Sequence, residues 1–288
     1  MRFFLIFFFI INFSCKEENL QIELLDENIT YPQFIEEEND TINQNSLLKT
    51  CIDGYAGKYP CKNFDLVGYL SLNDLKTSMA NDNWGWTDSE NGKEYVLIGV
   101  LEGTAIVDIS FPQTPIYLGL IPSLTESSQW RDIKVYKDYA FIVSEAKDHG
   151  LQVFNLKKIK NKLGGDNFKT DFILNDFGSA HNIYINNDSG FAYVFGNNKF
   201  FKGGPIFINI SNPEKPAIEG GFESKEYVHD AQIVNYKGPD LDYLGKEINV
   251  RSKETKVVFV DVSDKKNHKS GYAIRESLIN MAIGILHQ

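Results

Sequence analysis

The sequence contains none of the short motifs that mark the common catalytic chemistries. It has no GxxxxGK[ST] phosphate loop, no GxGxxG dinucleotide turn, no HExxH zinc helix and no GxSxG nucleophile turn. Histidine is scarce as well, with five in 288 residues. The motifs therefore assign no reaction to this chain.

Positive charge is also in short supply. The chain carries 29 Lys and Arg against 39 Asp and Glu, which gives a formal net charge of −10. An acidic surface repels the phosphate backbone of nucleic acids. We therefore do not expect a nucleic-acid partner.

Only three cysteines are present, and all lie in the first quarter of the chain. Cys51 and Cys61 have neither a CxxC pair nor a nearby histidine, so a metal site is poorly supported and a disulfide is favoured. Closing a loop of this size restrains the unfolded chain by about 2–3 kcal/mol.

The N-terminus has the features of an export signal. Arg2 precedes an apolar run over residues 3–13, which is shorter than the ~20 residues that a membrane-spanning helix needs. Ser14 stands directly before Cys15, which resembles a bacterial lipobox. We interpret residues 1–14 as a signal peptide and Cys15 as the lipidated anchor. A plain secretory signal is the alternative.

Residues 15–48 are expected to form an acidic, disordered tether. From residue 16 onward they hold nine acidic residues against one lysine, and such self-repelling segments stay extended. The sequence Lys16-Glu17-Glu18 resembles the signal that sends Bacteroidetes lipoproteins to the outer face of the outer membrane. The expected location is therefore the cell surface, with the membrane as a partner through the lipid.

Four short apolar segments repeat one pattern along the body of the chain. Each is rich in β-branched and aromatic residues, which is typical of strands, and each carries Asp or Asn at the same place. The segments are TAIVDIS (104–110), LQVFNLK (151–157), PIFINIS (205–211) and VVFVDVS (257–263), with Asp108, Asn155, Asn209 and Asp261 at the shared place.

A polar or aromatic anchor residue precedes each of these segments, with another apolar run between the two. The anchors are Trp84, Arg131, His181 and His229, spaced by 47, 50 and 48 residues. Four strands in about 48 residues match the ~40–50-residue period of propeller blades, and the 3.6-residue spacing of a helical solenoid is missing. We therefore predict an all-β fold, a β-propeller with about four blades over residues 49–264.

Several longer strings resemble one family. The strings NDNWGWTD, WRDIKVYKDYAFIVSEA, FGSAHNIYIN and HDAQIVNYKGPD are similar to those of LVIVD-repeat proteins called the choice-of-anchor B family. The resemblance spans about residues 51–263. It implies a propeller at the cell surface, held by the anchor that the species uses, which would be the lipid at Cys15. It implies no activity.

The resemblance leaves the closure of the propeller open. Family members have about seven blades, whereas the pattern in this chain breaks after Asp264. Residues 265–288 do not follow the repeat and are interpreted as an aberrant tail. One interpretation is a truncation or frameshift near residue 268. The other is a four-bladed ring closed by a strand at residues 65–72.

Residues at the start of each unit are the best candidates for a site, because they converge near the mouth of a propeller channel. They are Trp84, Arg131, Asp132, His181, Asn182, His229 and Asp230.

Three roles are open for these residues. They could lock the blades together through hydrogen bonds, bind a protein or glycan ligand, or hold a divalent metal through His181, His229 and Asp230. The two functional hypotheses are a surface binding or scaffold module and a metal-dependent surface or periplasmic enzyme.

The lipid anchor can be tested by removing its thiol. We expect a Cys15→Ala variant to leave the membrane fraction, because the acyl chains have no other attachment site. Fractionation followed by immunoblotting measures this, and a variant that still partitions with membranes contradicts the lipoprotein interpretation.

Overall fold

The computed structural model describes residues 48–224, 228–253, 256–265 and 273–278. The regular secondary structure of these residues is almost entirely β-strand, apart from two short 3₁₀ helices, η1 (Leu156–Ile159) and η2 (Phe201–Gly203). The all-β prediction is confirmed. Within these ranges no helix has the length and apolar character needed to cross a membrane. The predicted signal peptide, Cys15 and nearly all of the tether lie outside the described residues.

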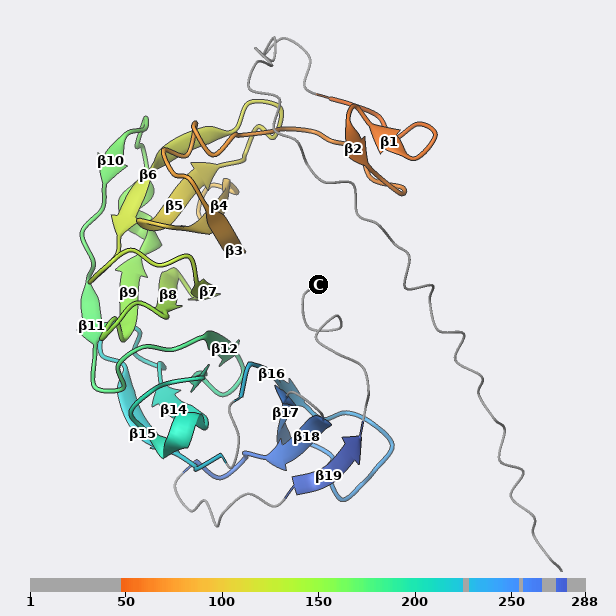
Figure 1. The fold of residues 1–288 in the computed structure, drawn as a ribbon, viewed down its shortest axis with the longest axis vertical. Coiled ribbons are helices and arrows are strands. Elements are labelled where there is room, and N and C mark those ends of the chain that lie inside the picture. The colour runs from red at the N-terminus through yellow and green to blue at the C-terminus, as the bar shows by residue number, and fades with distance from the viewer. Residues whose placement is uncertain (1–47, 225–227, 254–255, 266–272, 279–288) are drawn as a thin grey trace, which may run out of the picture. The chain divides into compact units, whose positions relative to one another are not determined.

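The strands form four main sheets that follow one another along the chain (Figure 1). The first holds β3 (Ala80–Thr87), β4 (Glu94–Val100), β5 (Gly103–Asp108) and β6 (Ile116–Pro122). The second holds β7 (Arg131–Tyr136), β8 (Tyr139–Ser144), β9 (Leu151–Asn155) and β11 (Phe172–Leu174). The third holds β12 (Asn182–Asn186), β13 (Phe191–Phe195), β14 (Ile206–Asn209) and β15 (Ala217–Gly221). The fourth holds β16 (Asp230–Asn235), β17 (Glu247–Lys253), β18 (Lys256–Asp261) and β19 (Ala273–Leu278).

All four sheets share one antiparallel order, in which each strand pairs with the strand of the same sheet that comes next along the chain. The first sheet has one addition, because β10 (Asp166–Asn167) pairs in parallel with β6. Gly119 permits this close approach, since a Cβ at that position would lie 2.0 Å from the carbonyl oxygen of Asp166.

The first strand of each sheet contacts the first strand of the next. β3 contacts β7, β7 contacts β12, and β12 contacts β16. We call these four the inner strands. Each is an edge strand of its own sheet, so its outer backbone groups need partners other than a neighbouring strand of that sheet.

The shared Asp or Asn ends the third strand of every sheet in the same way. Its side-chain oxygen accepts a hydrogen bond from the backbone N–H two residues later, at 2.9–3.0 Å. Such Asx turns stop a strand and turn the chain. The acceptors are Asp108, Asn155, Asn209 and Asp261.

The cores lie between successive sheets. Leu97 and Ile106 of the first sheet are fully buried with Ile142 and Phe154 of the second. The second and third sheets share another buried cluster, and the third and fourth a further one. The second and third sheets are thus buried on both faces, which explains why strands such as β8 are continuous apolar runs rather than alternating ones.

The run at residues 65–72 does not form the strand that its apolar sequence predicts. Its only bridge joins Leu66 to Lys49. Leu70 and the buried Leu75 instead pack on the face of the first sheet that points away from the second, against Val100 and Val107. The segment therefore covers a sheet face. There its apolar side chains are removed from water against the apolar surface of the sheet.

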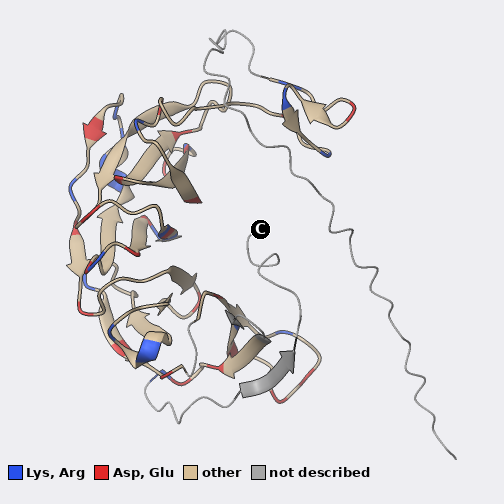
Figure 2. Ribbon diagram, in the orientation of Figure 1, with Lys and Arg blue, Asp and Glu red and all other residues tan. Residues whose placement is uncertain are grey.

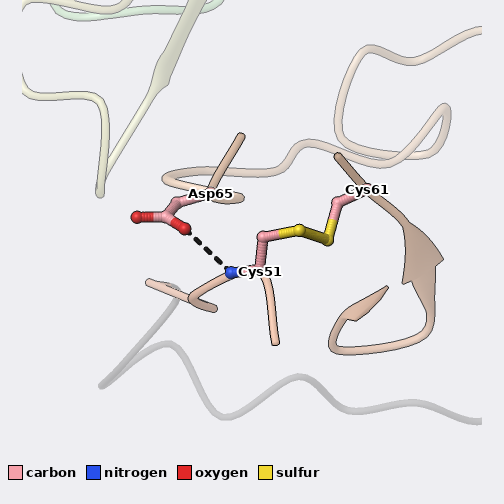
Figure 3. Close-up of a disulfide and its surroundings, with 3 residues drawn as sticks. All are labelled: Cys51, Cys61 and Asp65. Carbon is pink, nitrogen blue, oxygen red and sulfur yellow. Dashed lines mark hydrogen bonds between the residues drawn. A yellow bond between two sulfur atoms is a disulfide. The ribbon is translucent and has the colours of Figure 1, made fainter. Parts of the chain in front are cut away.

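A small hairpin precedes this segment. β1 (Tyr55–Ala56) pairs with β2 (Tyr59–Pro60), and a disulfide joins Cys51 to Cys61 across it, with a Cα–Cα distance of 5.9 Å (Figure 3). The carboxylate of Asp65 accepts a hydrogen bond from the Cys51 backbone N–H at 2.8 Å. The disulfide restrains this hairpin, which has few buried side chains of its own to stabilise it.

The fourth sheet takes its last strand from residues 265–288, which the sequence pattern separates from the repeats. β19 pairs with β18, although β18 ends the recognisable pattern. Lys265 is buried and donates to the Glu247 carboxylate at 2.5 Å. Tyr193 of the third sheet donates to the same carboxylate at 2.5 Å, so Glu247 joins these two sheets to the segment after β18.

Acidic and basic residues are interspersed over the sheets (Figure 2). Many of them form exposed ion pairs, such as Lys202 with Glu223 at 2.7 Å. Exposed pairs of this kind contribute at most about 1 kcal/mol each. The fold therefore rests on the cores between the sheets and on the buried polar contacts described next.

Candidate functional site

Asp132 joins the second sheet to the third. It lies near the start of the inner strand β7 with only 7% of its surface exposed. Its Oδ2 accepts the backbone N–H of Ile183 at 2.8 Å and the side-chain amide of Asn182 at 2.7 Å, both on β12. Its Oδ1 accepts the Lys134 ammonium at 2.5 Å. One carboxylate therefore pairs one backbone N–H at the free edge of the neighbouring inner strand.

Asp82 makes the same bond one sheet earlier. Its Oδ2 accepts the backbone N–H of Ile133 on β7 at 2.9 Å. Asp82 lies 50 residues before Asp132, so it is the counterpart of that residue in the first unit. The anchor residue predicted for this unit is Trp84 instead. Trp84 lies two residues further on, half-exposed, with the Lys134 ammonium 4.5 Å from its ring centroid.

Asn182 holds the corresponding position on β12. It is largely buried, and its amide nitrogen is already committed to Asp132. Its Oδ1 is buried without a hydrogen-bond partner among the described residues. The position that holds a carboxylate in the first two sheets, Asp82 and Asp132, thus holds an amide in the third.

Arg131, another of the predicted site residues, is buried. Only 2% of its surface is exposed. Its guanidinium donates to the backbone carbonyls of Val100 at 3.0 Å and Leu101 at 3.5 Å, and contacts His149 Nε2 at 3.3 Å. Because Val100 belongs to β4 and Arg131 to β7, this side chain ties the first sheet to the second.

His149 is held neutral beside this guanidinium. Its Nδ1 lies 3.0 Å from the carbonyl oxygen of Gly150, so Nδ1 carries the proton and Nε2 accepts from Arg131. Complete burial lowers the pKa of His149 to about 4, and the Arg131 charge adds to this. Burial likewise lowers the pKa of Arg131 to about 10.

Three rings form a row along the starts of the inner strands. Trp130, His181 and His229 directly precede β7, β12 and β16. The ring centroids of Trp130 and His181 lie 6.4 Å apart, and those of His181 and His229 lie 4.3 Å apart. Successive rings are tilted by 55° and 51°. The structure therefore brings together the two histidines that the sequence singled out.

Carboxylates flank both imidazoles. His181 Nδ1 lies 2.6 Å from Glu145 Oε1, and His229 Nδ1 lies 3.8 Å from Asp230 Oδ2. In the described part of the chain, however, no three His, Cys, Asp or Glu side chains are grouped so that they could hold a metal ion. The predicted set of His181, His229 and Asp230 does not make such a group.

Comparison with known proteins adds no relative. Neither a scan against models of protein families nor a search of curated proteins gave a match to this chain.

Sequence reasoning missed Asp82 and Glu145, and it interprets His149, which precedes Gly150, only as part of a hairpin turn. The spacing of 50 residues from Asp82 to Asp132, and again from Asp132 to Asn182, could have found Asp82. Glu145 and His149 do lie in the connection between β8 and β9, but nothing in the sequence marks their contacts with His181 and Arg131.

The buried His149 predicts a loss of stability in acid. Its folded pKa lies below the ordinary value of 6.5, so its contribution is complete above pH 6.5 and is lost as the pH falls towards 4. The full loss, reached below pH 4, is roughly 3 kcal/mol of unfolding free energy. Because other groups titrate over the same interval, urea unfolding at pH 7 and pH 4.5 measures it as the difference between the wild type and a variant without the imidazole.

A His149→Gln variant is the control, because glutamine keeps a donor and an acceptor but does not titrate. Its unfolding free energy is expected to fall less than that of the wild type over the same interval. Equal slopes in the two proteins would show that His149 is not the titrating group.

Proposed function

We propose that this chain is a cell-surface lipoprotein whose LVIVD-type β-propeller binds an extracellular ligand. The observation that carries the proposal is the row of Trp130, His181 and His229 at the starts of three consecutive inner strands. Each of these rings comes from a different repeat of the chain. Together they make one continuous surface from segments that are far apart in the sequence.

Two features support a propeller related to the choice-of-anchor B family. The four sheets share one antiparallel order, and their first strands contact one another in succession. Both are properties of propeller blades, whose first strands surround a central channel.

The Cys51–Cys61 disulfide supports export. Structural disulfides persist in oxidising surroundings, and they are rare in reducing cytosol. An export signal with lipidation at Cys15 would place the sheets outside the membrane, and the acidic segment up to residue 48 would separate them from it.

The chemistry of the row suits a glycan or a polar protein segment. Trp130 is 46% exposed and offers an apolar ring face, while Glu145 and Asp230 offer acceptors for hydroxyl or amide donors. Binding sites commonly combine aromatic surface with a few fixed polar groups in this way. Aromatic residues also carry much of the binding energy in protein interfaces.

A metal-dependent enzyme is the second candidate. The 4.3 Å separation of the His181 and His229 rings favours it, since imidazole is a common ligand of zinc, copper and iron. It would need at least one further ligand, supplied by the substrate or by water.

The binding function can be tested on a printed array of oligosaccharides and peptides. We expect the purified chain to bind a subset of spots, and a Trp130→Ala/His229→Ala variant to lose at least about tenfold of that signal. Phe64→Ala is the matched control, because Phe64 is 78% exposed and lies outside the row. Binding that survives the double substitution places the ligand elsewhere.

Metal addition separates the two candidates. A binding module is expected to keep its melting temperature when Zn²⁺, Cu²⁺ or Ni²⁺ is added to the chelator-treated protein. A rise that is lost in a His181→Ala variant favours the enzyme instead, because a ligand that binds only the folded state stabilises it.

A further inference from the structure

The two carboxylates that join the first three sheets also share one cation. Asp82 on β3 and Asp132 on β7 both lie beside the Lys134 ammonium. Lys134 lies beside both, at 2.5 Å from Asp132 Oδ1 and 3.9 Å from Asp82 Oδ2. All three side chains are largely removed from water, with 31% of Asp82, 10% of Asp132 and 12% of Lys134 exposed.

One ammonium cannot balance two buried carboxylates. Among the described strands, β4 and β7 make the main contacts with β3. On β7 the charged side chains that face Asp82 are Asp132 and Lys134. The charged residue of β4 is Glu94, and it pairs with Thr87 at the opposite end of β3. The site is therefore neutral only when a proton is held between the two carboxylates.

This proton belongs mainly to Asp82. Burial raises the pKa of Asp82 to about 7, the nearby Asp132 charge raises it further, and Lys134 opposes both. Protonated Asp82 can share its hydrogen with Asp132 while its Oδ2 still accepts the Ile133 N–H. Ionised Asp82 places a second negative charge against Asp132 at the joint.

The direction of the pH effect follows from this. The folded-state pKa of Asp82 lies above its ordinary value of 3.8, so the folded joint holds the proton more tightly than the open one. The contribution of Asp82 to the free energy of unfolding is fully present below about pH 4 and declines as the pH rises towards 7.

We propose that Asp82 and Asp132 form a proton-operated latch that loosens the joint between the first and second sheets as the pH rises. Because Asp132 also accepts the Ile183 N–H and the Asn182 amide, the charge on Asp82 acts on the joint with the third sheet as well. The latch does not depend on the ligand of the ring row. It would let an exported protein respond to the pH outside the cell.

Hydrogen exchange at the Ile133 amide reads the latch directly. After correction for the intrinsic pH dependence of exchange, opening at Ile133 is expected to rise roughly tenfold or more from pH 5.5 to pH 8, since one pKa unit corresponds to tenfold. The amide of Ile208, in the buried third sheet, should not change over this interval.

The Asp82→Asn variant keeps an acceptor for Ile133 and a donor for Asp132 but cannot ionise, so its exchange should be independent of pH. Asp166→Asn is the matched control, because Asp166 is 33% exposed and also faces a lysine. It should behave as the wild type. A flat wild-type profile, or an equal rise in Asp82→Asn, would overturn the proposal.

A second variant keeps the test decisive if Asp82→Asn does not fold. Removing the cation in Lys134→Gln should move the midpoint of the transition to higher pH, because Lys134 lowers the pKa of Asp82. A midpoint that stays in place or moves to lower pH contradicts the latch.

Discussion

The free edge of each inner strand is the constraint on which the rest of the structure depends. A strand at a sheet edge has backbone N–H groups without a neighbour, and burying them unpaired costs about 1–3 kcal/mol each. On β7 and β12 the chain meets this need at one N–H each with a side chain from the preceding sheet, Asp82 for Ile133 and Asp132 for Ile183. The same bonds align the first sheet with the second and the second with the third, so that apolar faces such as those of Leu97 and Phe154 meet.

The apolar cores and the polar contacts between the sheets therefore contribute differently to the fold. The cores between the sheets supply most of the stabilisation, since burial of apolar area is worth about 25 cal/mol per Å². They are poor at fixing the relative position of two sheets, because apolar contact is not directional. Asp132, Arg131 and Glu247 fix it, since each bonds to a neighbouring sheet in one geometry.

Much of this could be predicted from the sequence, because a repeat displays its unit several times. The Asp or Asn at the end of each third strand, such as Asp108, was visible as a pattern before its Asx turn was known. Features that occur once were not visible. Residues 65–72 have a strand-like sequence but cover a sheet face, and His149 is buried by contacts with Arg131 that no local pattern encodes. β19 was missed because its sequence departs from the repeat.

A double-mutant cycle between Asp132 and Asn182 tests the central claim most directly, since the two residues belong to different sheets and meet at 2.7 Å. Unfolding free energies of the wild type, Asp132→Ala, Asn182→Ala and the double variant give the coupling energy. The account predicts about 1–3 kcal/mol, as for buried hydrogen bonds to a charged group. A coupling energy of zero would contradict the account, because it would show that the Asp132 carboxylate and the Asn182 amide do not act together across the two sheets.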